Sequence, residues 1–180
     1  MELNEELKVA VIGLGYVGLP LAVEFAKRRP VVGYDHDHQR ILELNEGFDK
    51  TCEVSSAELN AAELIRFTDK LNDVCNCNCF IVAVPTPLDA DNNPDLSILK
   101  EACAAVGSIL TSGDLIIFES TVYPGVTEEV CVPILEQCSS LKLNDTLFVG
   151  YSPERVNPGD KAHRVSNIIK VTAASCPEAA

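Results

Sequence analysis

A glycine-rich turn near the N-terminus constrains this chain more than any other feature. Gly13, Gly15 and Gly18 form a G-x-G-x-x-G pattern between the apolar run 8–12 and the helical spacing of 19–28. In that context the first glycine permits a tight turn, the second lets a phosphate approach the backbone, and the third lets the helix pack closely on the strand. The helix N-terminus then offers N–H donors and a partial positive charge to an anion. The pattern therefore predicts a dinucleotide-binding turn.

The charge of the chain limits how such an anion could be held. Among the 180 residues, 27 are acidic and 14 are basic, which gives a formal net charge of −13. No cluster of Lys and Arg suggests a basic face, so nucleic acids and anionic membranes are not expected partners. A bound phosphate must then be held by backbone N–H groups and a few well-placed cations.

Asp35 identifies the expected cofactor. It ends the predicted strand 31–35 and stands seventeen residues after Gly18 (35 − 18). A dinucleotide-binding fold places a carboxylate there to accept from the adenosine ribose hydroxyls, and its charge disfavours a 2′-phosphate. We therefore expect NAD rather than NADP, although Arg40 could in principle meet a 2′-phosphate. The alternative is a tight strand-to-helix turn that binds no ligand.

Apolar runs alternate with helical spacing along the chain. The predicted strands are 8–12, 31–35, 65–68, 80–84, 115–119, 147–151 and 168–172, and the predicted helices are 19–28, 38–45, 55–64, 96–110 and 127–137. The strands are continuous Val/Ile/Leu/Phe runs, which is typical of parallel strands buried on both faces. The expected fold is one α/β domain of Rossmann type, with a doubly wound, mainly parallel sheet and helices on both faces.

The N-terminal run and the cysteines indicate the compartment and the metal content. The apolar run 9–23 contains three glycines and a proline and stops at Glu24, so it predicts no membrane helix. The charged residues before it are Glu2, Glu5 and Glu6 against one Lys8, which is not the basic start of a secretory signal. We expect a cytoplasmic protein whose eight cysteines are reduced. Cysteines at 75, 77 and 79 are expected to pack as thiols, and His36, Asp37 and His38 to be turn residues. No metal is expected.

Four segments carry a resemblance to a known family. They are GLGYVGLPLA at 13–22, VPTP at 84–87, ESTVYPG at 119–125 and YSPERVNPG at 151–159. Together they resemble the N-terminal NAD-binding domain of the UDP-glucose/GDP-mannose dehydrogenase family, over about residues 8–172. SPERVNPG replaces the SPEFLxEG pattern of the UDP-glucose enzymes, which favours the branch that acts on UDP-N-acetylhexosamines.

The resemblance implies a reaction and a set of roles. The reaction is an NAD-dependent oxidation of the sugar C6 alcohol to a carboxylate, through two hydride transfers and a thioester on a cysteine, for surface polysaccharide synthesis. Thr86 and Thr121 follow successive strands, at the edge where open α/β sheets bind ligands. The implied roles are NAD contacts for Tyr16, Val17, Arg40, Thr86 and Thr121, water positioning for Thr121, catalysis for Glu154, and substrate contacts for Glu154, Arg155 and Val156. Alternatively, Glu154 and Arg155 form a surface ion pair, and the Thr121 hydroxyl only ties the backbone.

The resemblance also has departures. Pro158 stands where the UDP-glucose branch has a second Glu, and Tyr123 stands where many relatives have Pro. No cysteine lies in the family's Gly-Gly-x-Cys context, so we expect residues 1–180 to be the cofactor-binding part of a longer enzyme, inactive alone, without the helical dimerisation segment and the C-terminal UDP-sugar domain. The longer enzyme is expected to be a homodimer or higher oligomer. Two alternatives stay open: a UDP-glucose or GDP-mannose 6-dehydrogenase, and a non-catalytic NAD-sensing module.

Overall fold

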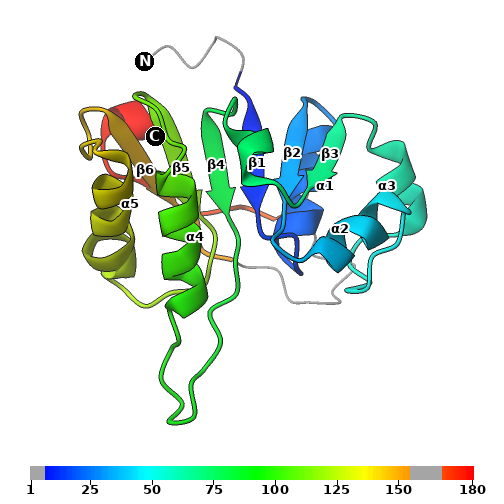
Figure 1. Cartoon of the computed structure of the whole chain (residues 1–180), viewed down its shortest axis with the longest axis horizontal. Coiled ribbons are helices and arrows are strands. Elements are labelled where there is room, and N and C mark those ends of the chain that lie inside the picture. Colours follow the sequence, from blue (N-terminus) through cyan, green and yellow to red (C-terminus); the bar gives the residue numbers. More distant parts are fainter. Residues whose placement is uncertain (1–6, 155–167) are drawn as a thin grey trace.

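The computed structural model describes residues 7–154 and 168–180, and it contains a seven-stranded sheet (Figure 1). The sheet order is β3-β2-β1-β4-β5-β6-β7, and β7 alone is antiparallel to its neighbour. The strands are β1 (Val9–Ile12), β2 (Val31–Tyr34), β3 (Ile65–Thr68), β4 (Cys79–Val82), β5 (Asp114–Phe118), β6 (Leu147–Tyr151) and β7 (Ala173–Ala174). The predicted doubly wound, mainly parallel sheet is confirmed.

Helices cover both faces of the sheet and enclose two hydrophobic cores. The helical elements are α1 (Gly18–Ala26), α2 (His38–Asn45), α3 (Ser56–Ala61), η1 (Leu71–Val74), α4 (Ser97–Gly107), η2 (Thr127–Cys131), α5 (Val132–Ser139) and η3 (Pro177–Ala179). One core lies between the sheet and helices α4 and α5, which stand side by side in Figure 1. The other core packs α1, α2 and α3 against the opposite face. Burial on both faces explains why the strands are continuous apolar runs.

The helix predicted at 127–137 is divided in the structure. Its first part is η2, a π-helical segment, and the α-helix α5 begins only at Val132. Pro133 lies in the first turn of α5 and has no N–H to donate to the carbonyl of Glu129. The α-helical bonding pattern cannot pass through this point, so the chain takes wider π-type bonds before the proline.

The strand predicted at 168–172 is wrong. These residues form no strand, and the short β7 that follows pairs only with Gly150 and Tyr151. The apolar residues that suggested a strand are not buried, since Ile169 is 87% exposed. Lys170, between them, instead forms an ion pair with Glu119. A side-chain contact, rather than sheet pairing, holds this segment.

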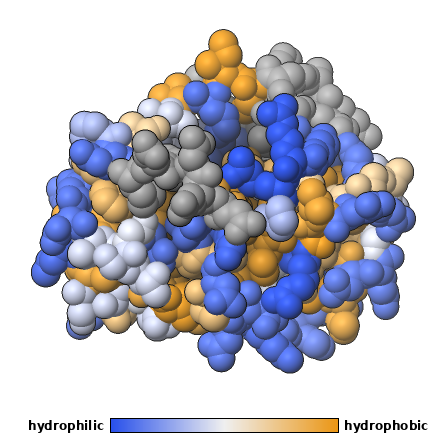
Figure 2. Space-filling view, turned by 90° about the horizontal axis from the view of Figure 1, so that it is seen from above, coloured by the Kyte–Doolittle hydropathy of each residue, from blue (hydrophilic) through white to orange (hydrophobic). Residues whose placement is uncertain are grey.

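The strand order places a crevice at the carboxyl ends of β1 and β4. The chain proceeds from β1 outward to β2 and β3, then returns to β4 on the other side of β1 and continues to β5 and β6. Loops that leave β1 and β4 therefore diverge, and open α/β sheets bind ligands at such a switch point. The molecule's opposite edge faces the viewer in Figure 2, where hydrophilic residues predominate around separate hydrophobic patches. Among the described residues, no helix has the length and apolar character needed to cross a bilayer.

The glycine turn is closed by direct backbone contact. Gly13 has a φ of +91°, a conformation that favours glycine, and a Cβ added to Gly18 would lie 1.8 Å from the Gly13 carbonyl oxygen. A Cβ added to Gly15, in contrast, would meet no heavy atom within 4 Å. Glycine at position 18 therefore allows the close packing of the helix on the turn. Glycine at position 15 instead leaves open space beside the backbone.

This difference predicts the stability of two matched variants. Gly18→Ala forces α1 away from β1 and should lower the free energy of unfolding by about 1–3 kcal/mol. Gly15→Ala should change it by less than about 0.5 kcal/mol. Urea unfolding of both variants and the wild type checks this, and equal losses for the two variants would contradict the assigned packing.

Candidate cofactor-binding site

A cleft of about 810 Å³ opens at the carboxyl edge of the sheet. Its walls come from the glycine turn after β1, the end of β2, and the loops after β4 and β5. Eight of the residues predicted to bind or to act line it: Gly13, Gly15, Tyr16, Val17, Asp35, Arg40, Thr86 and Thr121. The fold thus gathers residues that are more than one hundred positions apart in the sequence, from Gly13 to Thr121, into one site.

The glycine turn offers unpaired donors to the cleft. The backbone N–H groups of Gly15, Tyr16 and Val17 donate no hydrogen bond to any described residue. Helix α1 has nine residues and no side-chain cap at Val17. These three N–H groups, which precede the helix, and the positive end of its dipole are therefore available to an anion. The space beside Gly15 is the open side of this cradle.

Asp35 lies where a ribose carboxylate is expected, directly after β2. Its Oδ2 accepts from the N–H of Leu14 at 2.8 Å, and its Oδ1 accepts from the N–H of Asp37 at 3.0 Å. A carboxylate has about four acceptor sites, so both oxygens can still receive hydroxyl donors. These backbone contacts hold the carboxylate at the cleft wall and tie the end of β2 to the glycine turn.

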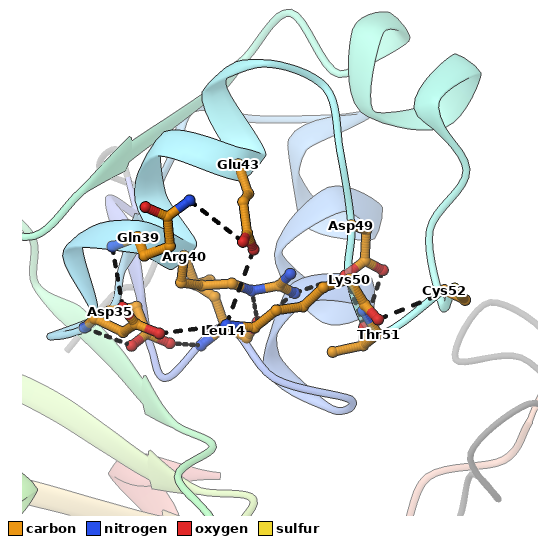
Figure 3. A network of polar contacts seen from close by, with 10 residues as sticks. Leu14, Asp35, Gln39, Arg40, Glu43, Asp49, Lys50, Thr51 and Cys52 are labelled. Carbon is orange, nitrogen blue, oxygen red and sulfur yellow. Dashed lines mark hydrogen bonds and ion pairs between the residues drawn. The ribbon is translucent and has the colours of Figure 1, made fainter.

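Arg40 is built into the wall of the cleft rather than projecting from it. The residue is only 2% exposed, and its Nε and Nη2 donate to the carbonyl oxygen of Leu14 at 2.9 and 2.7 Å. Nη2 also pairs with Asp49 Oδ1 at 2.7 Å (Figure 3). Arg40 therefore contacts the phosphate-binding turn directly, and its charge is already paired within the protein.

The loops after β4 and β5 are tied together at the other end of the cleft. Thr86 Oγ1 donates to the carbonyl of Thr121 at 2.5 Å, and Ser120 Oγ donates to the carbonyl of Val84 at 2.7 Å. Thr86 and Thr121 are thus neighbours. Glu154 follows β6, is partly buried, and does not line this cleft, while Arg155 and Val156 lie outside the described residues.

Glu119 also lines the cleft, although no sequence pattern predicted a role for it. It directly follows β5, begins the ESTVYPG segment, is 5% exposed, and forms an ion pair with Lys170. Burial raises the pKa of its carboxyl, and although Lys170 lowers it, the net shift is upward; nearby Glu154 adds to the rise. Its position directly after a strand and inside a motif could have indicated a role. The cation that pairs with it, Lys170, lies 51 residues away in the sequence.

The loop after α2 also contributes residues that the sequence pattern did not indicate. Lys50 and Thr51 also line the cleft, and Lys50 pairs with Asp37 at 3.3 Å.

Among the described residues, no group of three His, Cys, Asp or Glu side chains could hold a metal ion. His38 pairs with Asp69 at 2.5 Å.

The cysteine cluster at 75, 77 and 79 is split between surface and core. Cys75 is exposed, whereas Cys77 and Cys79 are buried. Burial raises the pKa of the Cys79 thiol to about 11, which keeps it protonated near neutral pH. The two buried cysteines thus pack as thiols, as expected for small apolar side chains.

Comparisons with known proteins show the family of this chain. The family model described as "UDP-glucose/GDP-mannose dehydrogenase family, NAD binding domain" matches residues 7–176. The chain belongs to this family. It is 58% identical to a UDP-N-acetyl-D-glucosamine 6-dehydrogenase of Pseudomonas aeruginosa and 51% identical to one of Salmonella typhi, each over 98% of the chain. It spans only 42% and 41% of those proteins.

A solved structure shows the same fold. The UDP-D-ManNAc dehydrogenase of Pyrococcus horikoshii superposes with a TM-score of 0.76 at 38% identity, covering 84% of this chain and 37% of that one. NAD is therefore the cofactor of this UDP-glucose/GDP-mannose dehydrogenase domain. The unpaired N–H groups, the open space beside Gly15 and the carboxylate of Asp35 fit such a dinucleotide.

Glu119 gives this domain a predicted pH dependence. Its pKa is raised above the usual 4.5 in the folded protein, so the unfolded chain loses this proton at lower pH than the folded one. Between pH 4.5 and the folded pKa, ionisation of Glu119 therefore lowers stability as pH rises. The free energy of unfolding of the wild type minus that of Glu119→Gln should fall across this window and be level on either side.

Urea unfolding at a series of pH values, from about pH 4 to 8, measures this difference. Taking the difference cancels the titration of groups common to both proteins. A difference that rises with pH in this window would show that the Lys170 pair outweighs burial and lowers the pKa.

Proposed function

We propose that this domain is the NAD-binding part of a UDP-N-acetylhexosamine 6-dehydrogenase that forms the uronic acid for surface polysaccharides. The observation that carries the cofactor half of the proposal is the cleft, which Asp35 lines together with Gly15, Tyr16 and Val17, whose N–H groups have no acceptor among the described residues. The substrate half rests on the similarity to UDP-N-acetyl-D-glucosamine 6-dehydrogenases and on the SPERVNPG segment.

In this proposal each region of the cleft has one task. When bound, NAD accepts a hydride from the C6 carbon of the sugar in each of two oxidation steps. Gly15, Tyr16 and Val17 hold the pyrophosphate by backbone N–H groups, and Gly13 and Gly18 shape the turn. Asp35 accepts from the adenosine ribose hydroxyls, which also disfavours a 2′-phosphate.

The opposite end of the cleft serves the reacting part. Thr86 and Thr121 orient the nicotinamide, and Thr121 also positions the water that hydrolyses the thioester. Glu154 assists that hydrolysis as a general base, and Glu154, Arg155 and Val156 contact the UDP-sugar. The nucleophilic cysteine and the remainder of the sugar site belong to the longer enzyme, so the 180-residue chain binds NAD without turnover.

The proposed setting is the cytoplasm, and the proposed assembly of the longer enzyme is a homodimer or higher oligomer. All eight cysteines are free thiols in the structure, which suits a reducing compartment. The alternatives are a UDP-glucose or GDP-mannose 6-dehydrogenase and a non-catalytic NAD-sensing module. The sensing module shares the cleft but predicts no sugar oxidation by the longer protein.

The ribose contact is tested on the 180-residue chain. Asp35→Ala removes the carboxylate and should weaken NAD binding about 10- to 100-fold, the effect of losing hydrogen bonds to a charged group. Asp69→Ala is the matched control, because Asp69 follows the neighbouring strand β3 and does not line the cleft. Calorimetric titration with NAD measures both. Unchanged affinity in Asp35→Ala would refute the ribose assignment.

The substrate is tested on the longer enzyme. NAD reduction, followed by absorbance, should be fastest with a UDP-N-acetylhexosamine and much slower with UDP-glucose and GDP-mannose, and two NADH should form per sugar. A preference for UDP-glucose or GDP-mannose would favour the second enzyme reading. NAD binding without reduction in the presence of all three sugars would favour the sensing module.

A further inference from the structure

Asp49 is a buried carboxylate with no role in the function described so far. Its side chain has no exposed surface and pairs with Arg40 Nη2 at 2.7 Å. Its remaining acceptor sites are filled by the chain that follows it, from Thr51 N and Oγ1, Glu53 N and Val54 N. Burial raises the pKa of this carboxyl, but these hydrogen bonds lower it further, and the net direction is downward. Asp49 is therefore held as an anion inside the loop after α2.

Arg40 connects this anion to the phosphate-binding turn. Its Nε and Nη2 both donate to the carbonyl oxygen of Leu14, while the N–H of Leu14 donates to Asp35 (Figure 3). The Leu14 backbone is thus held from both sides. Because a trans peptide is planar, the Gly15 N–H points opposite to the Leu14 carbonyl. Arg40 therefore sets the direction of one of the N–H groups that face the cleft.

The geometry of the pair is not that of a simple stabilising contact. Burying an ion pair costs desolvation free energy, and apolar residues of similar size in its place often make a fold equally stable. A buried ion pair is therefore weak evidence of a contribution to stability. Moreover, Arg40 Nη1 is buried and has no partner among the described residues. The guanidinium thus leaves one nitrogen without an acceptor among the described residues, while its other two nitrogens both donate to a single carbonyl. That arrangement fixes the position of Leu14 and does not maximise the number of hydrogen bonds that Arg40 makes.

We propose that Asp49 is a positioning residue for NAD binding. It holds the Arg40 guanidinium against the Leu14 carbonyl, and so keeps the Leu14–Gly15 peptide in the orientation that presents its N–H to the pyrophosphate. Asp49 itself does not line the cleft. The proposal rests on the proposed function in so far as NAD is the ligand.

The test compares NAD affinity with fold stability in the 180-residue chain. Asp49→Asn keeps the shape of the side chain but loses its charge, and it should weaken NAD binding about tenfold or more. Asp114→Asn is the matched control: Asp114 is also buried, accepts from Thr111 N and Oγ1, and starts β5 at the edge remote from the cleft. Asp114→Asn should lower stability and leave the NAD dissociation constant unchanged.

A double-mutant cycle separates positioning from general destabilisation. Asp49 and Arg40 act through one contact, so Asp49→Asn combined with Arg40→Gln should bind NAD no more weakly than Arg40→Gln alone. Asp114→Asn combined with Asp49→Asn should bind NAD like Asp49→Asn. Arg40→Lys keeps the charge but cannot span Asp49 and Leu14 with a fork of donors, so it too should weaken NAD binding. Arg40→Lys carries the test if Asp49→Asn does not fold.

The outcomes distinguish the two proposals. Wild-type affinity in folded Asp49→Asn, full additivity of Asp49→Asn and Arg40→Gln, or wild-type affinity in Arg40→Lys would each overturn the positioning role while NAD binding stands. A wild-type chain that binds no NAD would overturn the proposed function, and the role of Asp49 with it. Circular dichroism of every variant at the titration temperature establishes that folded protein is compared.

Discussion

The cleft depends on the contact between the start of α1 and the end of β1. Gly18 lies so close to the Gly13 carbonyl that no side chain fits between them. This contact brings the first turn of α1 to the carboxyl edge of the sheet, next to the point where the strand order reverses. The turn residues Gly15, Tyr16 and Val17, whose N–H groups have no acceptor among the described residues, then line the crevice between the loops after β1 and β4. Without that close approach, the parallel sheet would form its crevice but present no phosphate cradle in it.

Backbone donors also resolve how an acidic chain can hold an anionic cofactor. The net charge of −13 leaves few cations to spare, and the one arginine in the wall of the cleft is already paired with Asp49. N–H groups at a helix start bring partial positive charge without a counterion, and burying them in a site costs no side-chain entropy. The acidic side chains of the cleft can therefore serve other tasks, as Asp35 does when it receives donors from the turn.

Local patterns in the sequence predict most of the fold and part of the site. The glycine turn, Asp35 and six of the seven predicted strands depend on neighbours within one β-α-β unit, and they are found where the pattern places them. What the pattern missed depends on contacts between distant side chains. Glu119 meets Lys170 across 51 residues, and no periodicity marks Asp49 as the partner of Arg40. The strand predicted at 168–172 is wrong for the same reason. Its apolar residues suggested burial in the sheet, whereas the ion pair of Lys170 with Glu119 holds the segment.

Two ion pairs, one buried and one partly buried, therefore lie at the two ends of the cleft and have similar roles. Arg40 and Asp49 join the loop after α2 to the glycine turn, while Lys170 and Glu119 join the C-terminal segment to the end of β5. Each pair fixes a segment that has little apolar surface of its own to bury: Ile169 is largely exposed, and the chain after Asp49 is organised around its carboxylate. Each pair is also neutral as a unit, so the walls are held without adding net charge to the cleft. The geometry of the donors, rather than an excess of cations, then decides where a dinucleotide can lie.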